Sequence, residues 1–280
     1  MKEILKKDVG SKTLVEDILA GTLVDRQKTY QDLTSSQQEW ADESFVWVSG
    51  QEQYIQLNEP LLVLAARDAY GDEWNPVKWI LGRSSDLSAA QQGFDFEQVA
   101  ARKVATALKD NVLRIKDDQG ATLTVDMVPD EYTAITIKAS KNFDLARFLQ
   151  RPQTRTMFLP NNSDGPDVVF WVLCNGGQWY VVLIQAKYYQ AAISGEKTGA
   201  AFDTVAKQLP GGCNAPALRI FFPFMGASYA ANPALLVEHR MIGEDNYMYL
   251  DHKNAGAQVL GEHVCEALHR MKKKRKAAPA

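Results

Sequence analysis

Two continuous apolar runs in the second half of the chain give the clearest structural signal. Residues 167–173 and 179–188 are rich in Val, Ile, Leu and aromatic side chains, and a short turn at residues 175–178 separates them. Hydrophobicity that is continuous rather than alternating indicates strands covered on both faces, as in the middle of an α/β sheet. The pattern therefore predicts a buried hairpin, and residues 218–224 predict a further buried strand.

Helical periodicity surrounds this hairpin. In the first half of the chain, residues 93–109 give the clearest helix, because Val99, Ala100, Val104 and Leu108 recur on one face. Further helices are expected at residues 61–70, 143–149, 199–209 and 258–271, and further strands at residues 112–115, 122–128, 133–138 and 247–250. Helices that alternate with strands predict the α/β class. Residues 1–90 are expected to form a mostly helical extension packed on this core.

Length and apolar runs restrict the kind of protein. A chain of 280 residues forms one large domain or two small ones. The longest uninterrupted apolar run, residues 168–174, has seven residues, whereas a membrane helix needs roughly 20. The N-terminus is charged and has no signal-peptide pattern. We therefore expect a soluble protein without a membrane partner, although a leader removed from the chain stays possible.

The three cysteines do not form a recognisable ligand or disulfide set. Cys174, Cys213 and Cys265 lie far apart in the sequence, and none belongs to a CxxC pair. This spacing is typical of free thiols in a reducing compartment.

The charge distribution is uneven. The net charge is −3, but residues 270–276 hold six cations in seven positions, so the rest of the chain carries −9. An acidic chain of this kind does not attract nucleic acid over its whole surface. Binding would therefore need a local basic groove, a bound metal or the basic run at residues 270–276. The run itself, which is Lys272, Lys273, Lys274, Arg275 and Lys276, is typical of a nuclear localisation signal read by an import receptor. The alternative is a frayed helix end whose cations complement the helix dipole.

Three polar residues at the ends of the buried hairpin are candidates for chemistry. Gln185 and Lys187 are two positions apart, so they point to the same side of their strand. Antiparallel pairing across the short turn brings Asp167 close to both. A carboxylate, an amide oxygen and an ammonium group then meet at one edge of the hairpin. This combination suits Mg²⁺ or Mn²⁺ and a scissile phosphate.

These residues resemble a known signature. The segments GPDVVF at residues 165–170 and VLIQAKYY at residues 182–189 look like the D…(D/E/Q)xK pattern of the PD-(D/E)XK, restriction-endonuclease-like superfamily. More narrowly, they are similar to the nuclease-like domain of Crinkler-RHS-type effectors. The resemblance covers roughly residues 90–225. It implies a mixed central β-sheet flanked by helices, and a nuclease-like domain at residues 91–269 followed by a basic tail at residues 270–280.

The resemblance also implies a set of site residues. Asp167 and Glu97 would be metal ligands, Gln185 a neutral ligand, and Lys187 the residue that positions the attacking water. Glu131 competes with Glu97 for the upstream position.

The resemblance gives further candidates for nucleic acid contact. Lys207 and Gln208 would line the phosphate path, or else belong to a solvated helix face. Tyr188 would stack on bases, although aromatic strand residues belong more often to the core.

Two functions are therefore left open. The first is a nuclear, metal-dependent endonuclease or nickase acting on double-stranded DNA, an effector that reaches the nucleus of a host cell after secretion. The second is an inactive nuclease-like fold that binds DNA or a host nuclear protein. The neutral Gln185 and the acidic body favour the second function, whereas the retention of Lys187 favours the first.

Overall fold

The computed structural model describes residues 35, 47–48, 55–56, 75–84, 89–132, 134–139, 143–161, 164–188, 195–224, 239–251 and 255–277. The strands of its large sheet are β5 (Val125–Met127), β6 (Ile135–Lys138), β7 (Thr156–Leu159), β8 (Val168–Cys174), β9 (Gln178–Tyr188), β10 (Ala217–Phe224), β11 (His239–Ile242) and β12 (Asp245–Tyr249). The helices are α4 (Pro76–Ser84), α5 (Ala89–Lys109), α6 (Leu145–Leu149), α7 (Gly195–Ala206), the short 3-10 helix η3 (Pro210–Gly212), α8 (Ala255–Leu260) and α9 (Glu262–Ala277). Two small hairpins pair β1 (Trp47–Val48) with β2 (Ile55–Gln56) and β3 (Ile115–Lys116) with β4 (Thr122–Leu123).

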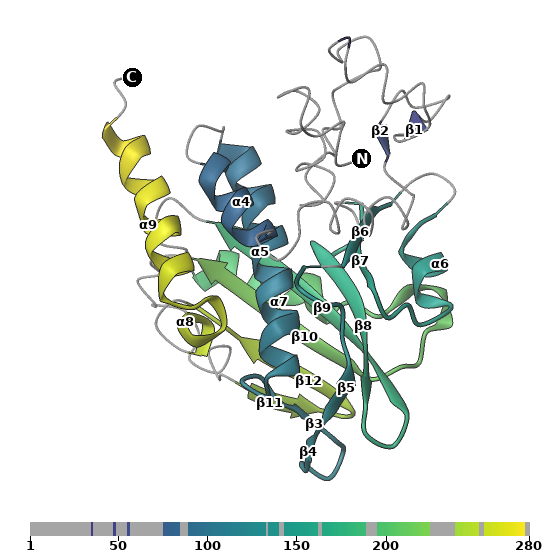
Figure 1. Ribbon diagram of the computed structural model, residues 1–280. Coiled ribbons are helices and arrows are strands. Elements are labelled where there is room, and N and C mark those ends of the chain that lie inside the picture. The colour runs from purple at the N-terminus through teal and green to yellow at the C-terminus, as the bar shows by residue number, and fades with distance from the viewer. Residues whose placement is uncertain are drawn as a thin grey trace.

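The large sheet is mixed, in the order β11-β12-β10-β9-β8-β7-β6, and β5 also pairs with β8 (Figure 1). Strand β8 runs antiparallel to both β7 and β9, whereas β10 is parallel to β9 and β12 is parallel to β10. Strand β6 is parallel to β7, and β11 closes the other edge antiparallel to β12. The expected α/β class, with a mixed central sheet flanked by helices, is confirmed.

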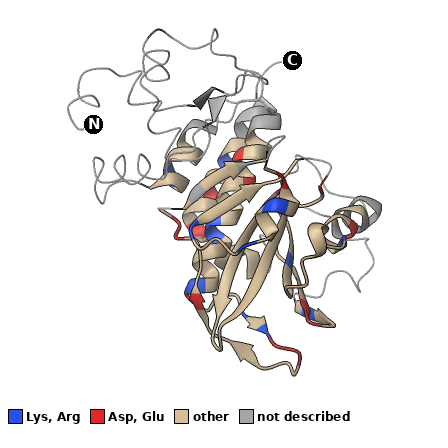
Figure 2. Ribbon diagram, turned by 90° about the vertical axis from the view of Figure 1, so that its right-hand side faces the viewer, with Lys and Arg blue, Asp and Glu red and all other residues tan. Residues whose placement is uncertain are grey.

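The two faces of the sheet are covered by different helices. Even-numbered residues of β9, such as Ile184 and Ala186, share one apolar cluster with residues of α4, α5, α8 and α9. Odd-numbered residues, such as Leu183, belong to a second cluster with α6. Helix α7 packs on β9 and β10, and Arg219 of β10 donates hydrogen bonds to the carbonyl groups of Val205 and Lys207 at its end. Because both faces are covered, the strands are almost free of charge, as the mostly tan strands in Figure 2 show.

The structure confirms most of the expected elements and corrects several. The buried hairpin is β8–β9, and the expected helix at residues 93–109 is α5, which begins four residues earlier, at Ala89. The helix expected at residues 258–271 is interrupted at Gly261, whose φ of +79° ends α8 before α9 begins. Strands β7 and β11 were not predicted.

The expected boundaries of the N-terminal extension and the basic tail fall inside helices. Residue 90 belongs to α5, and residues 269 and 270 both belong to α9. Most of the expected extension, including the helix at residues 61–70, lies outside the described residues. Of the part that is described, α4 packs against α5 and α9.

The cysteines agree with the expectation of free thiols. Cys174 is buried, Cys213 and Cys265 are half-buried, and all three are free. Separately, none of the helices that the structure describes combines the length and the apolar composition needed to cross a membrane.

Candidate functional site

The β8–β9 hairpin positions the three residues singled out from the sequence. Val168 pairs with Ile184, so Asp167, just before β8, lies opposite Gln185 on β9. The Asp167 backbone N–H donates to the Ile184 carbonyl oxygen at 2.8 Å and continues the ladder by one residue. Asp167, Gln185 and Lys187 therefore meet on one side of the hairpin, as predicted. We call these three residues the carboxylate cluster.

The Asp167 carboxylate is the acceptor for all the polar contacts within this cluster. The Lys187 Nζ donates to Oδ2 at 2.9 Å and to Oδ1 at 3.1 Å. The Gln185 Nε2 donates to Oδ2 at 2.5 Å, and the Ala186 backbone N–H donates to the same oxygen at 2.9 Å. Oδ2 thus receives three donors and Oδ1 one, which leaves Oδ1 with capacity for another contact.

Burial decides the electrostatics of the carboxylate cluster. The side chain of Asp167 is 16% exposed, that of Lys187 is 33% exposed, and Gln185 as a whole is 3% exposed. Burial raises the pKa of Asp167 above its ordinary value, and the ammonium of Lys187 and the hydrogen bonds from Ala186 and Gln185 oppose that shift only in part. Keeping the carboxylate ionised therefore costs free energy. Such a cost is common where a charged group serves chemistry rather than stability.

The side-chain oxygen of Gln185 is the atom of the carboxylate cluster that best supports a cation site. Oε1 is buried and finds no hydrogen-bond partner among the described residues. Buried polar atoms are normally satisfied, so an orphaned carbonyl oxygen beside a carboxylate fits a site for a hard cation. Within the part of the chain that the structure describes, however, no three His, Cys, Asp or Glu side chains gather as a metal site. The donor set that fits a cation is thus one carboxylate and one amide oxygen.

Gly165 explains how the chain reaches Asp167. Its φ is +115°, and a Cβ at this position would lie 2.9 Å from the Thr204 carbonyl oxygen of α7. Only glycine adopts this backbone conformation without strain and lets the two backbones approach so closely. This contact was not predicted, although the Gly165-Pro166 step directly before Asp167 is a visible signal in the sequence.

Glu97 is not brought into the carboxylate cluster by any described contact. It is half-buried on α5, and the neighbouring Phe96 packs on Tyr188, Phe222 and Phe224. These rings belong to the face of the sheet that α5 covers, whereas the carboxylate cluster alternates with Ala186 and faces the other layer.

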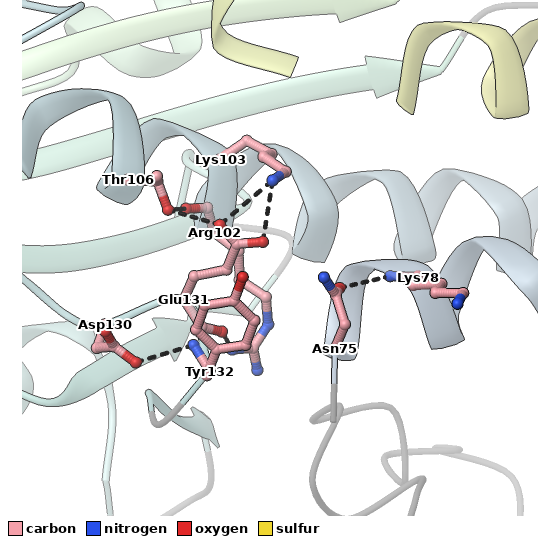
Figure 3. Close-up of polar contacts among 8 residues, drawn as sticks. All are labelled: Asn75, Lys78, Arg102, Lys103, Thr106, Asp130, Glu131 and Tyr132. Carbon is pink, nitrogen blue, oxygen red and sulfur yellow. Dashed lines mark hydrogen bonds and ion pairs between the residues drawn. The ribbon is translucent and has the colours of Figure 1, made fainter. Parts of the chain in front are cut away.

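Glu131, the competing candidate, is engaged elsewhere (Figure 3). Its carboxylate lies 3.0 Å from the Lys103 Nζ and accepts a hydrogen bond from the Thr106 hydroxyl at 2.7 Å. Its backbone carbonyl accepts from the buried Arg102 at 2.6 Å. All three partners belong to α5, so Glu131 fastens its loop to that helix. This arrangement argues against Glu131 as the upstream metal ligand.

The three residues expected to contact nucleic acid differ in position. Lys207 and Gln208 are exposed just after α7, and the Lys207 stem passes beside Gly165. The Tyr188 hydroxyl donates to the Leu268 carbonyl oxygen at 2.9 Å, and its ring stacks on Phe224. These contacts fasten α9 to the sheet and argue against a role for Tyr188 in stacking on bases.

The predicted nuclear signal, Lys272 to Lys276, lies in the last turns of α9, and its side chains are outside the described structure.

No known protein family, curated protein or solved structure matches this chain.

Proposed function

We propose that this protein is a metal-dependent DNA endonuclease or nickase of the PD-(D/E)XK type. The observation that carries the proposal is the convergence of Asp167, Gln185 and Lys187 at one end of the β8–β9 hairpin. The surrounding order of elements, with α5 before the antiparallel β7–β8–β9 and α7 before the parallel β10, agrees with the mixed, helix-flanked core of that superfamily.

Asp167 and Gln185 would hold the cation, through the carboxylate and the orphaned Oε1. Mg²⁺ or Mn²⁺, when bound there, supplies a polarised water and neutralises charge on the scissile phosphate. The Gln185 amide presents its nitrogen to Asp167, so a rotation of the amide group by half a turn would present the oxygen instead. Glu97 as a third ligand rests on the resemblance alone.

Lys187 would act on the substrate directly. Its ammonium lies against Asp167, yet the side chain is 33% exposed, so the same group can reach solvent and a phosphate oxygen. A cation fixed beside the reacting phosphate stabilises the charge that develops during hydrolysis. Asp167 would hold the Lys187 ammonium in place, and the exposed Lys207, whose stem lies beside Gly165, would contact the DNA backbone.

A second candidate function is DNA or protein binding without cleavage. Asp167 Oδ2 already accepts three hydrogen bonds, and the neutral Gln185 supplies one less negative charge for a cation than an acid would. Both features lower the affinity for Mg²⁺.

Plasmid cleavage distinguishes the two functions. We expect nicking or linearisation of supercoiled DNA with Mg²⁺ or Mn²⁺, and a loss of about 100-fold or more in the Lys187→Ala variant. The matched control is Lys109→Ala, because the side chain of Lys109 is 62% exposed and lies at the far end of α5. Equal cleavage by the native protein and Lys187→Ala would identify a contaminant. Salt-sensitive DNA retention without cleavage would establish the binding function.

The cellular setting proposed for this activity is the nucleus of a host cell, as in Crinkler-type effectors. The supporting feature is the run of five cations from Lys272 to Lys276, which an import receptor would bind. A fluorescent fusion large enough to be excluded from passive diffusion should accumulate in nuclei. The same fusion with these five residues changed to Gln should stay outside, and nuclear entry of both fusions would rule out this signal.

A further inference from the structure

A cavity of about 790 Å³ lies between α4, α5 and the junction of α8 with α9. It is on the α5 side of the sheet, away from the face that holds the carboxylate cluster. Its volume is within the range of roughly 300–1,000 Å³ that is usual for small-molecule sites. Neither the resemblance nor the proposed nuclease activity assigns it a role.

Three cationic side chains, each from a different helix, line this cavity. They are Lys78 of α4, Lys103 of α5 and Arg270 of α9. Lys78 and Arg270 are exposed, whereas the side chain of Lys103 is only 20% exposed. Figure 3 shows Lys103 reaching to Glu131, with the start of α4 at Asn75 and Lys78 to one side. The two oxygens of Glu131 lie 3.0 and 3.3 Å from the Lys103 Nζ. An ammonium has three N–H donors, so Lys103 keeps at least one for a ligand.

The charge balance favours a ligand with a single negative charge. Glu131 offsets one of the three cations and Glu262, which also lines the cavity, offsets a second, which leaves one positive charge in excess. The N-terminal turns of α4 and α9 both contribute to the lining, through Asn75 and Glu262, and the positive end of a helix dipole adds to the attraction. Net attraction for one anionic group follows.

The apolar part of the lining is aliphatic. Val77, Leu81, Val264 and Met271 form most of it, and the exposed His263 supplies the one aromatic ring among the described residues that line the cavity. Nucleobases are usually recognised by stacking on aromatic rings, and one exposed imidazole offers little surface for stacking, so this lining suits a saturated chain better than a nucleotide. A saturated chain packs well against Val, Leu and Met.

We propose that this cavity binds an aliphatic carboxylate, with the chain on the α4–α9 lining and the head group at Lys78, Lys103 and Arg270. Calorimetric titration of the full-length protein with octanoate, decanoate and dodecanoate tests the proposal. Each added methylene contributes a gain of about fourfold, so each step of the series should lower Kd about 15-fold. Decanol and decylammonium should bind far more weakly than decanoate, since they lack the negative charge.

Variants locate the binding to this cavity. Lys78→Gln with Arg270→Gln removes two exposed cations and should weaken decanoate binding several-fold, whereas Lys109→Gln, on an exposed part of α5 outside the cavity, should leave it unchanged. Lys103→Met with Glu131→Gln removes both charges of the buried pair without leaving either unpaired, and should weaken binding more than tenfold.

The absence of binding by all three acids overturns the proposal. So does equal affinity for decanoate and decylammonium, or unchanged affinity in both double variants. DNA cleavage is not the readout, so these results are independent of the proposed nuclease function.

Discussion

At the scale of single residues, Asp167 is held charged in a place that disfavours charge. Its pKa is raised because burial outweighs the ammonium of Lys187 and the two N–H groups that contact it. A raised folded-state pKa means that the native protein binds this proton more tightly than the unfolded chain does. The ionised form therefore lowers stability as pH rises above the ordinary carboxyl pKa and through the folded pKa.

The first prediction concerns Asp167→Asn. At neutral pH this variant should be as stable as the native protein or more stable, because it removes the buried charge and its amide can pair with Gln185 Oε1. The stability difference should shrink in acid, where the native carboxyl is protonated as well. Cleavage should be lost. Denaturant unfolding between neutral and acidic pH measures the first effect, and plasmid nicking measures the second.

A stability measurement can contradict the expectation that Asp167→Asn keeps its stability while it loses cleavage. A large loss of stability in Asp167→Asn at neutral pH would show that the pair with Lys187 stabilises the fold, and that the carboxylate cluster is structural. Leu183→Ala, an aliphatic change on the neighbouring strand β9, serves as a reference for ordinary destabilisation and should cost about 2–5 kcal/mol.

The second prediction concerns Gln185→Glu, which introduces the acid that is more usual in the proposed D…(D/E)xK pattern. A second carboxylate at the 2.5 Å contact with Asp167 creates repulsion, so without divalent ions the variant should melt several degrees lower than the native protein. Mg²⁺ should raise its Tm more than it raises the native Tm, since a second anionic ligand increases affinity. Thermal melts with and without Mg²⁺ test this without any measurement of activity.

Gln185→Met is the control for that series. It removes the orphaned oxygen and the hydrogen bond to Asp167, and it adds no charge. Its Tm should not respond to Mg²⁺. If Gln185→Glu shows no larger response than Gln185→Met, the carboxylate cluster does not bind Mg²⁺.

At the scale of elements, the hairpin and the longer helices could be predicted, whereas the shortest strands and one helix break could not. The strands β8 and β9 are long and continuously apolar, so the pattern identifies them without knowledge of their neighbours. Strand β7 has four residues, and such a short apolar run does not distinguish a strand from a piece of helix. The break between α8 and α9 depends on one glycine at positive φ inside an otherwise helical pattern.

Some features of the candidate site could likewise be predicted from the sequence, and others could not. Strand alternation alone places Gln185 and Lys187 on one side, and the short turn brings Asp167 to them. The Ala186 backbone N–H, which contacts Asp167, leaves no mark in the sequence. The choice between Glu97 and Glu131 depended on how α5 sits on the sheet, which no local pattern encodes. Glu131 is committed to Lys103 and Thr106, and Glu97 stays a prediction.

The third prediction tests the contact between α7 and the chain before β8. Gly165→Ala adds a Cβ 2.9 Å from the Thr204 carbonyl oxygen, at a φ of +115°, so the backbone must shift. We expect a loss of about 1–3 kcal/mol in the free energy of unfolding, together with a strong loss of cleavage because Asp167 moves with Gly165. Urea unfolding and plasmid nicking are the measurements.

Gly176→Ala is the matched control, since Gly176 also has positive φ, +84°, but no atom lies within 4 Å of the added Cβ. It should cost about 1 kcal/mol from the backbone conformation alone and leave cleavage intact. If the two variants lose equal stability and equal activity, the close approach of α7 has no part in positioning Asp167.

At the scale of the whole molecule, the two proposed sites lie on opposite sides of the large sheet. The carboxylate cluster lies on the side of the sheet that α7 covers. The cavity lined by Lys78, Lys103 and Arg270 lies on the side that α5 covers. A ligand in the cavity contacts α4 and α9, so any effect on the carboxylate cluster must pass through α5 or the strands. The last turns of α9, which carry the basic run, extend beyond the sheet in Figure 1.

The fourth prediction follows from the charge of the body. Without the six cations of residues 270–276 the chain carries −9, so electrostatic attraction to DNA should come largely from this run. Each phosphate contact contributes about 0.9 to the slope of log affinity against log salt, so changing the five residues from Lys272 to Lys276 to Gln should reduce the slope by up to about 4.5. Filter binding to plasmid DNA over a range of salt concentrations measures it, with Lys109→Gln as the control. An unchanged slope in the five-residue variant would assign the DNA contact to the body, and the exposed Lys207 beside Gly165 would then be the first position to neutralise.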